Sequence, residues 1–321
     1  MIPKGKAAAK LKIQVLAGGI SHERDISLKS GRRVADALTE YGATVVIREP
    51  DSKLLANIAK DKPDVIWPVL HGASGEDGAL RDILTLTGVP FVGATPEAAR
   101  LAWDKSIAKI LVTRAGIQTP PSITLPKETF RELDAESVLS SITKSIALPL
   151  VVKPARGGSA QGVSIVTKIE DLNRAMVDAY VYCDVVIIEK LVEGTELALS
   201  VIDLGAGPIA LPAVEVVPRT SHFSYEERYT AGETDYFIPA RLDAKTSEAA
   251  RKVAVTAHEV LGLRHLSRID MIVDANGIVW FLEANVLPGL TETSLLPMAI
   301  TASGNSLGEV YYSLAEAAKR G

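Results

Sequence analysis

Residues 281–294 read Phe-Leu-Glu-Ala-Asn-Val-Leu-Pro-Gly-Leu-Thr-Glu-Thr-Ser, and this stretch decides how we interpret the chain. It continues the short apolar run Ile278–Leu282, which is typical of a buried strand. Glu283 and Asn285 are two residues apart, so on an extended strand their side chains point to one face. Carboxylate and amide oxygens are the ligands that Mg²⁺ prefers beside substrate phosphates. Pro288-Gly289 then predicts a turn whose N–H groups could face a ligand.

A second polar strand precedes this one. Ser267–Val273 alternates Arg268 and Asp270 with apolar residues, and Asp274–Gly277 supplies turn residues between the two runs. A hairpin would bring Arg268 and Asp270 onto the same surface as Glu283 and Asn285. Two interpretations follow: a half-buried sheet with a solvated charged face, or a metal–nucleotide site. Because buried carboxylates need a charge partner, we favour the metal–nucleotide site.

The composition is that of an ordinary globular protein. The chain has 321 residues, 47% hydrophobic and 23% charged, which allows two or three domains and a sizeable core. A net charge of −4 gives no global basic field for nucleic acid, so a bound polyphosphate needs locally placed lysines and arginines. Cys183, the single cysteine, excludes an internal disulfide framework and a cysteine-based zinc site. Its place beside the apolar run 185–188 predicts a role in core packing.

The chain carries no sign of a membrane or secretory segment. Apolar runs all fall short of the ~20 residues that span a bilayer. Met1–Lys12 is basic and alanine-rich but lacks an apolar core of secretory length, so we interpret it as a tail. We therefore expect a soluble cytoplasmic protein with small-molecule substrates and neither a membrane nor a nucleic-acid partner.

The first part of the chain alternates predicted strands and helices, which favours a parallel α/β sheet. The elements are, in order, a strand over Lys12–Ala17, a helix over 27–38 capped by Ser27, a strand over 45–47, a helix over 51–59 and a strand over 65–70. The Gly18-Gly19 turn could bind a ligand, but it lacks the Gly-x-Gly-x-x-Gly spacing of dinucleotide folds. A Rossmann dehydrogenase is therefore disfavoured.

His71-Gly-Ala-Ser-Gly-Glu-Asp-Gly, residues 71–78, follows the last of these strands. Ligands usually bind at this end of the strands in open α/β sheets, and the three glycines allow backbone to approach a ligand or to turn sharply. The stretch is equally compatible with a plain strand-to-helix turn. Residues 88–93 predict a loop and a short strand that close a first domain near residue 94.

The central part predicts a flap. A helix begins near Ala102–Ser106, with Asp104 at its start and Lys105 available to a phosphate. A strand over 149–154, a glycine-rich loop over 155–162 and a strand over 163–166 form a unit that could close over phosphates. An ordinary hairpin loop is the alternative. A P-loop is excluded because the glycines are not followed by Lys and Ser or Thr.

The segment 185–197 passes from an apolar strand into a connection. Its backbone can offer the donor and acceptor that an adenine edge requires, and Glu196 could accept ribose hydroxyls. Alternatively, Glu189 and Lys190 are simply a charged strand end. Further on, the polar segment 215–237 contains Tyr225, Tyr229 and Tyr236 and is predicted to be a long lid loop. Helices are predicted over 247–261 and 306–319.

Taken together, these stretches resemble the D-alanine–D-alanine ligases of the ATP-grasp superfamily, over about residues 18–298. The matching motifs, in the family's order, are Gly18-Gly-Ile-Ser-His-Glu-Arg-Asp-Ile-Ser-Leu, His71-Gly-x-x-Gly-Glu-Asp-Gly, Asp104-Lys105, Lys153-Pro and Leu282-Glu-Ala-Asn-x-x-Pro-Gly-Leu-Thr. The resemblance implies an α/β fold, α+β in part, with ATP between the central and C-terminal domains. The implied units are an N-terminal substrate-binding α/β domain over 1–94, a central subdomain over 95–188 and a C-terminal catalytic subdomain over 189–321 that carries the lid 215–237.

The resemblance also implies ligands and residue roles. ATP and two Mg²⁺ ions, with Mn²⁺ as a substitute, would be bound, the metal by Asp270, Glu283 and Asn285. Lys105 and Lys153 would contact phosphates, Glu189, Lys190 and Val192 the adenine, and Glu196 the ribose. The full set expected at the nucleotide is Lys105, Lys153, Ser159, Glu189, Lys190, Leu191, Val192, Glu196 and Arg228.

On the substrate side, the resemblance implies a hydrogen-bonded trio of Glu23, Ser159 and Tyr229. Glu23 and His71 would contact substrate, Glu23 receiving the ammonium of the first D-alanine and Ser294 the carboxylate of the second. Arg268 and the Gly289 N–H would stabilise the oxyanion. The implied activity is ATP-dependent formation of D-alanyl-D-alanine through an acyl phosphate, for peptidoglycan precursors, by a homodimer.

Two positions depart from the family's pattern. Arg228 stands where a loop lysine usually precedes the tyrosine, and Ala160 stands where the flap usually has a second serine. Both changes lie where the lid is expected to meet the flap. They support, as alternatives, a ligase of the same fold that joins other amino or hydroxy acids, and a non-catalytic ATP-binding paralogue. Tyr229 favours an amine acceptor, and the oxyanion donor beside the metal residues argues for catalysis.

Overall fold

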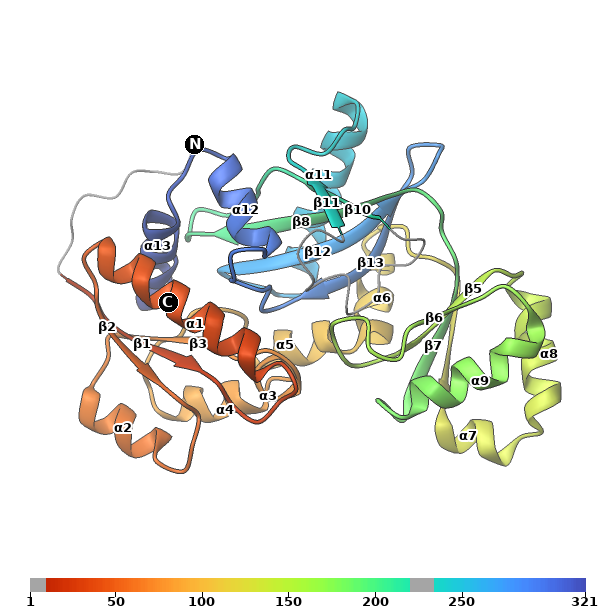
Figure 1. Cartoon of the computed structure of the whole chain (residues 1–321), viewed down its shortest axis with the longest axis horizontal. Helices are drawn as coiled ribbons and strands as arrows, with labels where there is room; N and C mark the ends of the chain where they lie inside the picture. The colour runs from red at the N-terminus through yellow and green to blue at the C-terminus, as the bar shows by residue number, and fades with distance from the viewer. Residues whose placement is uncertain (1–9, 220–233) are drawn as a thin grey trace.

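The computed structural model describes residues 10–219 and 234–321. Within them the strands form three sheets, each with its own helices (Figure 1). The first is a parallel sheet of order β2-β1-β3, made of β1 (Lys12–Ala17), β2 (Thr44–Arg48) and β3 (Val65–Val69). β1 and β3 are buried along nearly their full length, as expected of parallel strands between two helical layers. The predicted parallel α/β arrangement is therefore confirmed.

Helices from both ends of the chain cover this sheet. The helices of this part are α1 (Arg24–Glu40), α2 (Leu54–Asp61), α3 (Ala73–Glu76), α4 (Ala79–Leu86) and the C-terminal α13 (Leu307–Arg320). α1 and α13 share one core cluster with the strands, where Trp67 and Tyr311 meet edge to face with ring centroids 5.3 Å apart. α2 and α4 pack on the other face. The end of the chain therefore returns to the N-terminal sheet.

α1 begins at Arg24, before the predicted start, so the prediction that Ser27 caps the helix was wrong. Ser27 is buried inside the helix, where its Oγ accepts the Gly18 N–H at 2.8 Å and donates to the Val69 carbonyl oxygen. The hydroxyl ties the turn after β1 to the end of β3, from which the loop with His71 departs.

The second sheet is antiparallel, with order β4-β7-β5-β6. Its strands are β4 (Ser122–Pro126), β5 (Leu150–Pro154), β6 (Ser164–Val166) and β7 (Val185–Lys190), and its helices are α7 (Lys127–Glu132), α8 (Ala135–Ser145) and α9 (Ile169–Tyr180). The helices bury one face through a core that includes Leu150, Val152, Val186 and Ile188. Because side chains alternate along a strand, the intervening residues point to the opposite face, where Lys153, Ile187 and Glu189 are also buried.

The third sheet has order β11-β10-β8-β12-β13, with β9 paired to β8. Its strands are β8 (Thr195–Asp203), β9 (Pro208–Ala210), β10 (Val214–Pro218), β11 (Thr234–Phe237), β12 (Leu266–Val273) and β13 (Val279–Asn285). The remaining described helices are α5 (Pro96–Trp103), α6 (Lys105–Arg114), α11 (Ala244–Val260) and α12 (Leu295–Ala302). α5, α6 and α11 pack on one face of this sheet, although α5 and α6 precede the second sheet in sequence.

Three local predictions were wrong. The segment 215–237 is not a continuous loop, because its two ends are strands β10 and β11, which pair antiparallel from Glu215–Phe237 to Pro218–Thr234. Tyr225, Arg228 and Tyr229 lie outside the described residues. Residues 88–93 form no strand; Phe91 makes only an isolated parallel β-bridge to Ile66. Cys183 is half-buried rather than part of the core.

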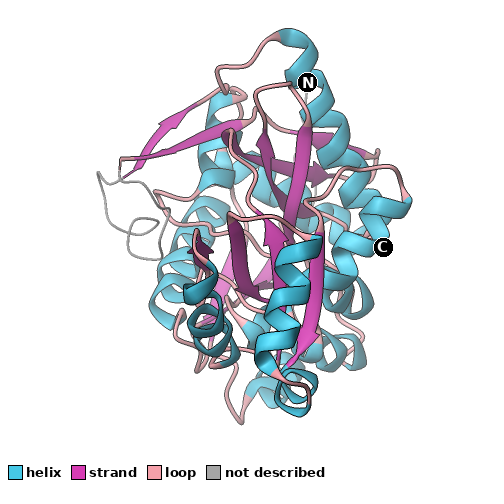
Figure 2. Ribbon diagram, turned by 90° about the vertical axis from the view of Figure 1, so that its right-hand side faces the viewer, coloured by secondary structure: helices cyan, strands magenta, loops and turns pink. Residues whose placement is uncertain are grey.

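In the side view of Figure 2, helices flank the strands. In the described ranges 10–219 and 234–321, no helix has both the length and the apolar character needed to cross a membrane.

Candidate active site

Two cavities adjoin at the meeting point of the sheets. The larger cavity, about 620 Å³, lies between the second and third sheets, within the size range of ligand pockets. The smaller cavity, about 100 Å³, lies between the β12–β13 hairpin and the loops that follow β1 and β3. Gly158, Glu196 and Asp270 line both cavities, so a ligand in one can reach a ligand in the other.

The β12–β13 hairpin forms as predicted, but a bulge is needed to aim its polar side chains. Asp270 pairs with Glu283, whereas the next residue, Met271, pairs with Phe281, so Leu282 is the extra residue. Phe281 is fully buried in the core on the helix side. In a regular strand Glu283 would point to that same side. The bulge shifts the alternation by one and brings Glu283 and Asn285 to the cavity face.

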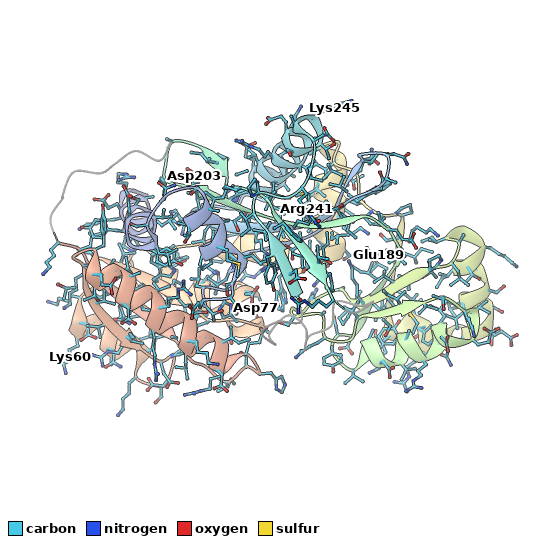
Figure 3. The ribbon with its side chains drawn as sticks, turned by 45° about the horizontal axis from the view of Figure 1, so that its top comes forward. Lys60, Asp77, Glu189, Asp203, Arg241 and Lys245 are labelled. Carbon is cyan, nitrogen blue, oxygen red and sulfur yellow. The ribbon has the colours of Figure 1, made fainter. Side chains whose placement is uncertain are left out.

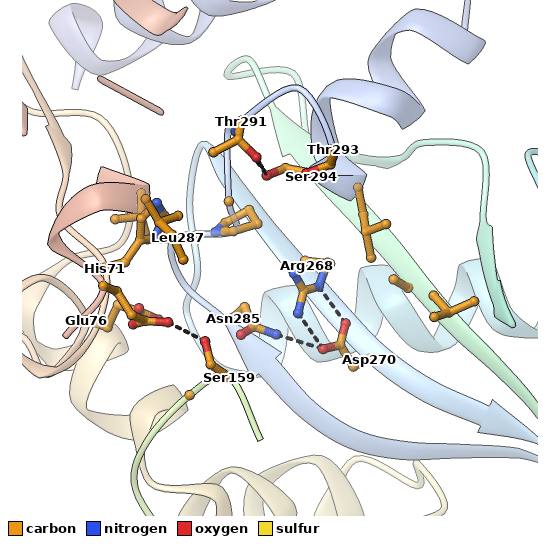
Figure 4. A pocket seen from close by; sticks show the side chains of 18 of the residues that line it. His71, Glu76, Ser159, Arg268, Asp270, Asn285, Leu287, Thr291, Thr293 and Ser294 are labelled. Atoms are coloured by element: carbon orange, nitrogen blue, oxygen red, sulfur yellow. Dashed lines mark hydrogen bonds and ion pairs between the residues drawn. The ribbon is translucent and has the colours of Figure 1, made fainter. Parts of the chain in front are cut away.

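The hairpin's polar groups bond to one another, both along β12 and between β12 and β13 (Figure 4). Arg268 donates from Nε and Nη2 to the two oxygens of Asp270 at 2.7 and 2.6 Å, a bidentate pair. Asn285 Nδ2 also donates to Asp270 Oδ2, at 3.1 Å. Asp270 is 8% exposed. The guanidinium is therefore held in a fixed orientation beside the smaller cavity.

A buried ion cluster lies on the floor of the larger cavity. Glu189, only 3% exposed, accepts from Lys153 Nζ at 2.5 Å and from Lys109 Nζ at 2.7 Å. Burial by itself would raise the pKa of Glu189, but the charges of Lys153 and Lys109 outweigh it and hold that pKa below its ordinary value. The carboxylate is thus ionised and committed to the two lysines.

The strand end beyond Glu189 offers backbone groups. The N–H of Lys190 donates to Pro121 O and that of Leu191 to Pro149 O. Lys190 Nζ donates to the carbonyl oxygens of Ala147 and Leu148. Among the described residues, the Val192 N–H has no such acceptor, and Val192 lines the larger cavity.

Lys105 connects the flap to the hairpin. Asp104 caps α6 by accepting the N–H groups of Ser106 and Ile107, as the sequence predicts, and this fixes Lys105 as the first helical residue. Lys105 Nζ donates to Gly157 O at 2.6 Å and lies 3.3 Å from Glu283 Oε2. The cation therefore sits between the glycine-rich loop and the polar strand.

A hydrogen bond joins the flap to the residue that precedes α1. Ser159 Oγ donates to Glu23 Oε1, joining residues 136 apart in sequence. Ser159 and Ala160 both have positive φ, +55° and +57°, an arrangement that costs energy for non-glycine residues. Two of the three members of the predicted trio are thus in contact, and the third, Tyr229, is outside the described residues.

The smaller cavity holds two buried groups in their neutral forms. Burial lowers the pKa of His71 to about 4, and the Arg268 charge acts in the same direction. Burial, together with the charge of Glu23, raises the pKa of Glu76 to about 8. Glu76 Oε1 accepts the Gly72 N–H at 2.8 Å, and a Cβ at Gly72 would lie 3.2 Å from Glu23 Oε2. The two carboxyl groups therefore flank a single glycine.

The far wall of the smaller cavity is the turn before α12. Ser294 Oγ accepts the Thr291 N–H at 3.0 Å and lies 2.8 Å from Thr291 Oγ1. A Cβ at Gly289 would lie 2.6 Å from Ser294 Oγ, so a larger residue there would displace the Ser294 hydroxyl. Ser294 is also the N-cap position of α12, where the helix dipole favours an anion.

Every described residue that the sequence nominated lines one of the two cavities. Those of the smaller cavity are Glu23, His71, Ser159, Glu196, Arg268, Asp270, Asn285, Gly289 and Ser294. Those of the larger are Lys105, Lys153, Glu189, Lys190, Leu191, Val192, Glu196, Asp270 and Glu283. Arg228, like Tyr229, is outside the described residues.

Sequence reasoning missed Lys109 and Glu76. Lys109 lies one helical turn after Lys105, a spacing that places both on one face of α6. Glu76 belongs to the 71–78 motif but was given no role. The feature that could have identified Glu76 is its place between Gly75 and Gly78, in the motif that follows the buried strand β3.

The donors available to a metal ion are hard oxygens. Asp270, Glu283 and Asn285 present carboxylate and amide groups at the border of the two cavities. Within residues 10–219 and 234–321, no three His, Cys, Asp or Glu side chains gather into a metal site. The set therefore consists of two carboxylates and one amide, chemistry that fits Mg²⁺ when substrate phosphates complete the shell.

Two antiparallel sheets that face each other across a cavity of about 620 Å³, with a flap on one sheet and a polar hairpin on the other, define an ATP-grasp fold. Comparison with known proteins narrows the class. The family described as "D-ala D-ala ligase C-terminus" matches residues 111–316. The D-alanine–D-alanine ligase of Pelotomaculum thermopropionicum is 36% identical over 96% of both chains. That of Bordetella petrii is 38% identical over 97% of this chain and 93% of its own.

Solved structures agree. VanG D-Ala:D-Ser ligase from Enterococcus faecalis has a TM-score of 0.82 at 28% identity, covering 96% of this chain and 99% of that one. D-alanine–D-alanine ligase from Bacillus anthracis complexed with ATP has a TM-score of 0.79 at 27% identity, covering 97% of each chain. This chain belongs to the D-alanine–D-alanine ligase family.

Proposed function

We propose that the chain is an ATP-dependent carboxylate–amine ligase that joins two D-alanines, with the nucleotide in the larger cavity and the amino acids in the smaller one. The observation that carries this proposal is the border between the cavities, where Asp270, Glu196 and the flap line both. A reaction that transfers a phosphoryl group from a nucleotide to a carboxylate needs the two substrates in contact. Adjoining cavities that share lining residues allow this contact. Family membership supplies the substrate class.

In the larger cavity, Lys105 and Lys153 would contact the phosphates, and the backbone near Glu189–Val192 the adenine. Glu196 would accept the ribose hydroxyls, and Arg228 and Ser159 would act at the phosphate end. Phosphoryl transfer relies on positioning and charge neutralisation more than on covalent help from the protein. Two lysines that line the cavity are suited to that task.

Mg²⁺ would be held by Asp270, Glu283 and Asn285 together with phosphate oxygens. When bound, the metal supplies charge neutralisation for the transferring phosphoryl group. The number of ions, replacement by Mn²⁺, a homodimeric state and a cytoplasmic location are further parts of the proposal that rest on the family resemblance.

In the smaller cavity, Glu23 would bind the first ammonium, with His71 beside it, and Ser294 the second carboxylate. The first D-alanine's carboxylate oxygen attacks the γ-phosphorus and ADP leaves, giving an acyl phosphate. The second amine attacks that carbonyl carbon, a C–N bond forms, and the C–O bond to phosphate breaks. Arg268 and the Gly289 N–H would stabilise the oxyanion, each such donor being worth roughly 3–4 kcal/mol.

An acyl phosphate hydrolyses readily, so water must be kept out. We propose that Tyr229 joins the Glu23–Ser159 hydrogen bond and completes a latch over the intermediate. Tyr229→Phe should then raise ADP release that is not accompanied by dipeptide. Unchanged coupling and unchanged KM for D-alanine would refute the latch.

D-Serine as the second substrate is the competing candidate. The structural likeness to a D-Ala:D-Ser ligase and the presence of Ala160 favour testing it. ADP release should be measured with Mg²⁺-ATP and D-alanine, and with D-serine, D-lactate and L-alanine in parallel, with products identified by mass spectrometry. Release with D-alanine alone supports the proposal. Turnover that requires another acid would indicate a ligase of the same fold with a different substrate. ATP binding without turnover would indicate a non-catalytic paralogue.

A further inference from the structure

Lys109 is a buried cation for which the reaction outlined above has no use. Its side chain is about 5% exposed, and its Nζ donates to Glu189 Oε2 at 2.7 Å and to the Pro120 carbonyl oxygen at 2.9 Å. It lies below the larger cavity, which Glu189 and Lys153 line. The side chain itself is not among the residues that line that cavity.

The contact joins the two bodies that enclose the larger cavity. Lys109 is on α6, whose Ala108 and Val112 are part of the core beneath the third sheet. Glu189 and Lys153 are on the neighbouring strands β7 and β5 of the second sheet and point away from its helix-covered face. Figure 3 labels Glu189 at the junction between the two bodies.

The charges in this cluster do not balance. One carboxylate receives two lysines, so the cluster carries an excess positive charge. An ionised carboxylate that is 3% exposed needs at least one close cation, because removal of its last partner leaves an uncompensated buried charge. With Lys109 present, Lys153 can turn toward an anion while Glu189 keeps a partner. With Lys153 as the single cation, the carboxylate would retain it.

We propose that Lys109 is a positioning residue for nucleotide binding: it neutralises Glu189 from below and thereby leaves Lys153 available to the phosphates of ATP. This inference rests on the proposed function, since it takes the larger cavity as the nucleotide site. It assigns the buried excess charge to polyphosphate recognition. Lys109 itself never touches the ligand.

The test is Lys109→Met, which keeps the length and apolar stem of the side chain and removes its charge. We expect the Kd for ATP, measured by calorimetry without any amino acid, to rise at least tenfold, which corresponds to about 1.4 kcal/mol. The Kd for adenosine, which has no phosphates, should stay within about twofold. KM for ATP should rise more than kcat falls. Arg114→Met, an exposed cation at the end of the same helix, is the matched control.

A second variant separates positioning from folding. Lys109→Met combined with Glu189→Gln removes the stranded carboxylate together with its partner, so Lys153 is no longer held. The double variant should bind ATP more tightly than Lys109→Met does, and it decides the question if the single variant does not fold. Lys109→Arg, which keeps the charge, should retain part of the affinity lost in Lys109→Met.

Three results would overturn the inference. The first is a folded Lys109→Met variant whose Kd for ATP equals that of the unaltered chain. Equal losses of ATP and adenosine affinity, which indicate a purely structural role, are the second. A double variant that binds ATP no better than the single one is the third. Failure of the unaltered chain to bind ATP would instead overturn the proposed function, and this inference with it.

Discussion

Two buried carboxyl groups, one in each cavity, are held in opposite states. Glu189 in the larger cavity contacts two lysines and has a pKa below its ordinary value, although burial alone would raise it. Glu76 in the smaller cavity has a backbone N–H and no salt bridge among the described contacts, and burial raises its pKa to about 8. At neutral pH the first is an anion and the second is a neutral acid.

The difference teaches what each cavity is built to receive. The floor of the larger cavity pairs Glu189 with two lysines, so this buried cluster has one cation in excess, which suits a polyanion. The smaller cavity keeps Glu76 and His71 neutral, so its charge comes from Glu23, Glu196 and the Arg268–Asp270 pair. That balance suits a small zwitterion, whose ammonium and carboxylate each need one counter-charge.

The largest effect is expected for Glu189, the ionised carboxyl group of the larger cavity. Glu189→Gln leaves Lys109 and Lys153 buried without their anion, and removal of one partner from a buried ion cluster typically costs about 3–5 kcal/mol. We expect a loss of that size in the free energy of unfolding, measured by urea titration at pH 7. A change too small to resolve would mean that the cluster is solvated, and the contrast with Glu76 would disappear.

Arg268→Met tests whether the two cavities divide binding from chemistry. Loss of one oxyanion donor lowers kcat by roughly 100–1000-fold. The Kd for ATP, measured without Mg²⁺, should stay close to that of the unaltered chain, because Arg268 lines the smaller cavity and reaches the larger one only through Asp270. Arg251→Met, on the exposed side of α11, is the control. An equal loss in ATP binding would contradict the division.

Glu76→Gln should act in the opposite direction to Glu189→Gln. A carboxyl group whose pKa is raised by folding releases its proton in the unfolded chain first, so it lowers stability as pH rises from 4.5 toward about 8. The neutral amide avoids this cost and can still accept the Gly72 N–H. We expect a gain of roughly 2–4 kcal/mol at pH 8, fading toward pH 4.5. Destabilisation at pH 8 would show that Glu76 is ionised.

The smallest effect concerns His71. Its pKa is lowered from 6.5 to about 4 in the folded chain, so the unfolded chain binds more protons between these values and stability falls as pH drops through that window. His71→Gln should remove about 2 kcal/mol of the stability change between pH 6.5 and pH 5. The measurement is the pH dependence of urea unfolding for both chains. Parallel profiles would mean that His71 is not buried as a neutral group.

Local sequence patterns predicted the hairpin, the parallel sheet and the motifs, because each depends on alternation or turn chemistry within a few residues. The nominated site residues followed from those motifs through the family resemblance, whereas Glu76 did not. Tyr229 and Arg228 stay predictions. The bulge at Leu282 was not predictable in this way, since it depends on which face Phe281 buries against α11 and α6.

Other features could not be predicted from the sequence, because they too depend on contacts between distant residues. Ser27 has the appearance of a helix cap, and only the packing of α1 on β1 and β3 turns its hydroxyl inward. Lys109 meets Glu189 across 80 residues, and no local pattern signals a contact of that range. The strands at both ends of 215–237 form by pairing with each other and with β8, which outweighs the polar character of the segment.

The most direct test of the account follows oxygen rather than product. D-Alanine labelled with ¹⁸O in its carboxylate is incubated with the protein and Mg²⁺-ATP, and phosphate and dipeptide are analysed by mass spectrometry. Ligation through an acyl phosphate predicts that each phosphate released carries one ¹⁸O, because the carboxylate oxygen that attacks phosphorus leaves with it. Dipeptide formed beside unlabelled phosphate would contradict the account, since the carboxylate would then never have joined the phosphoryl group.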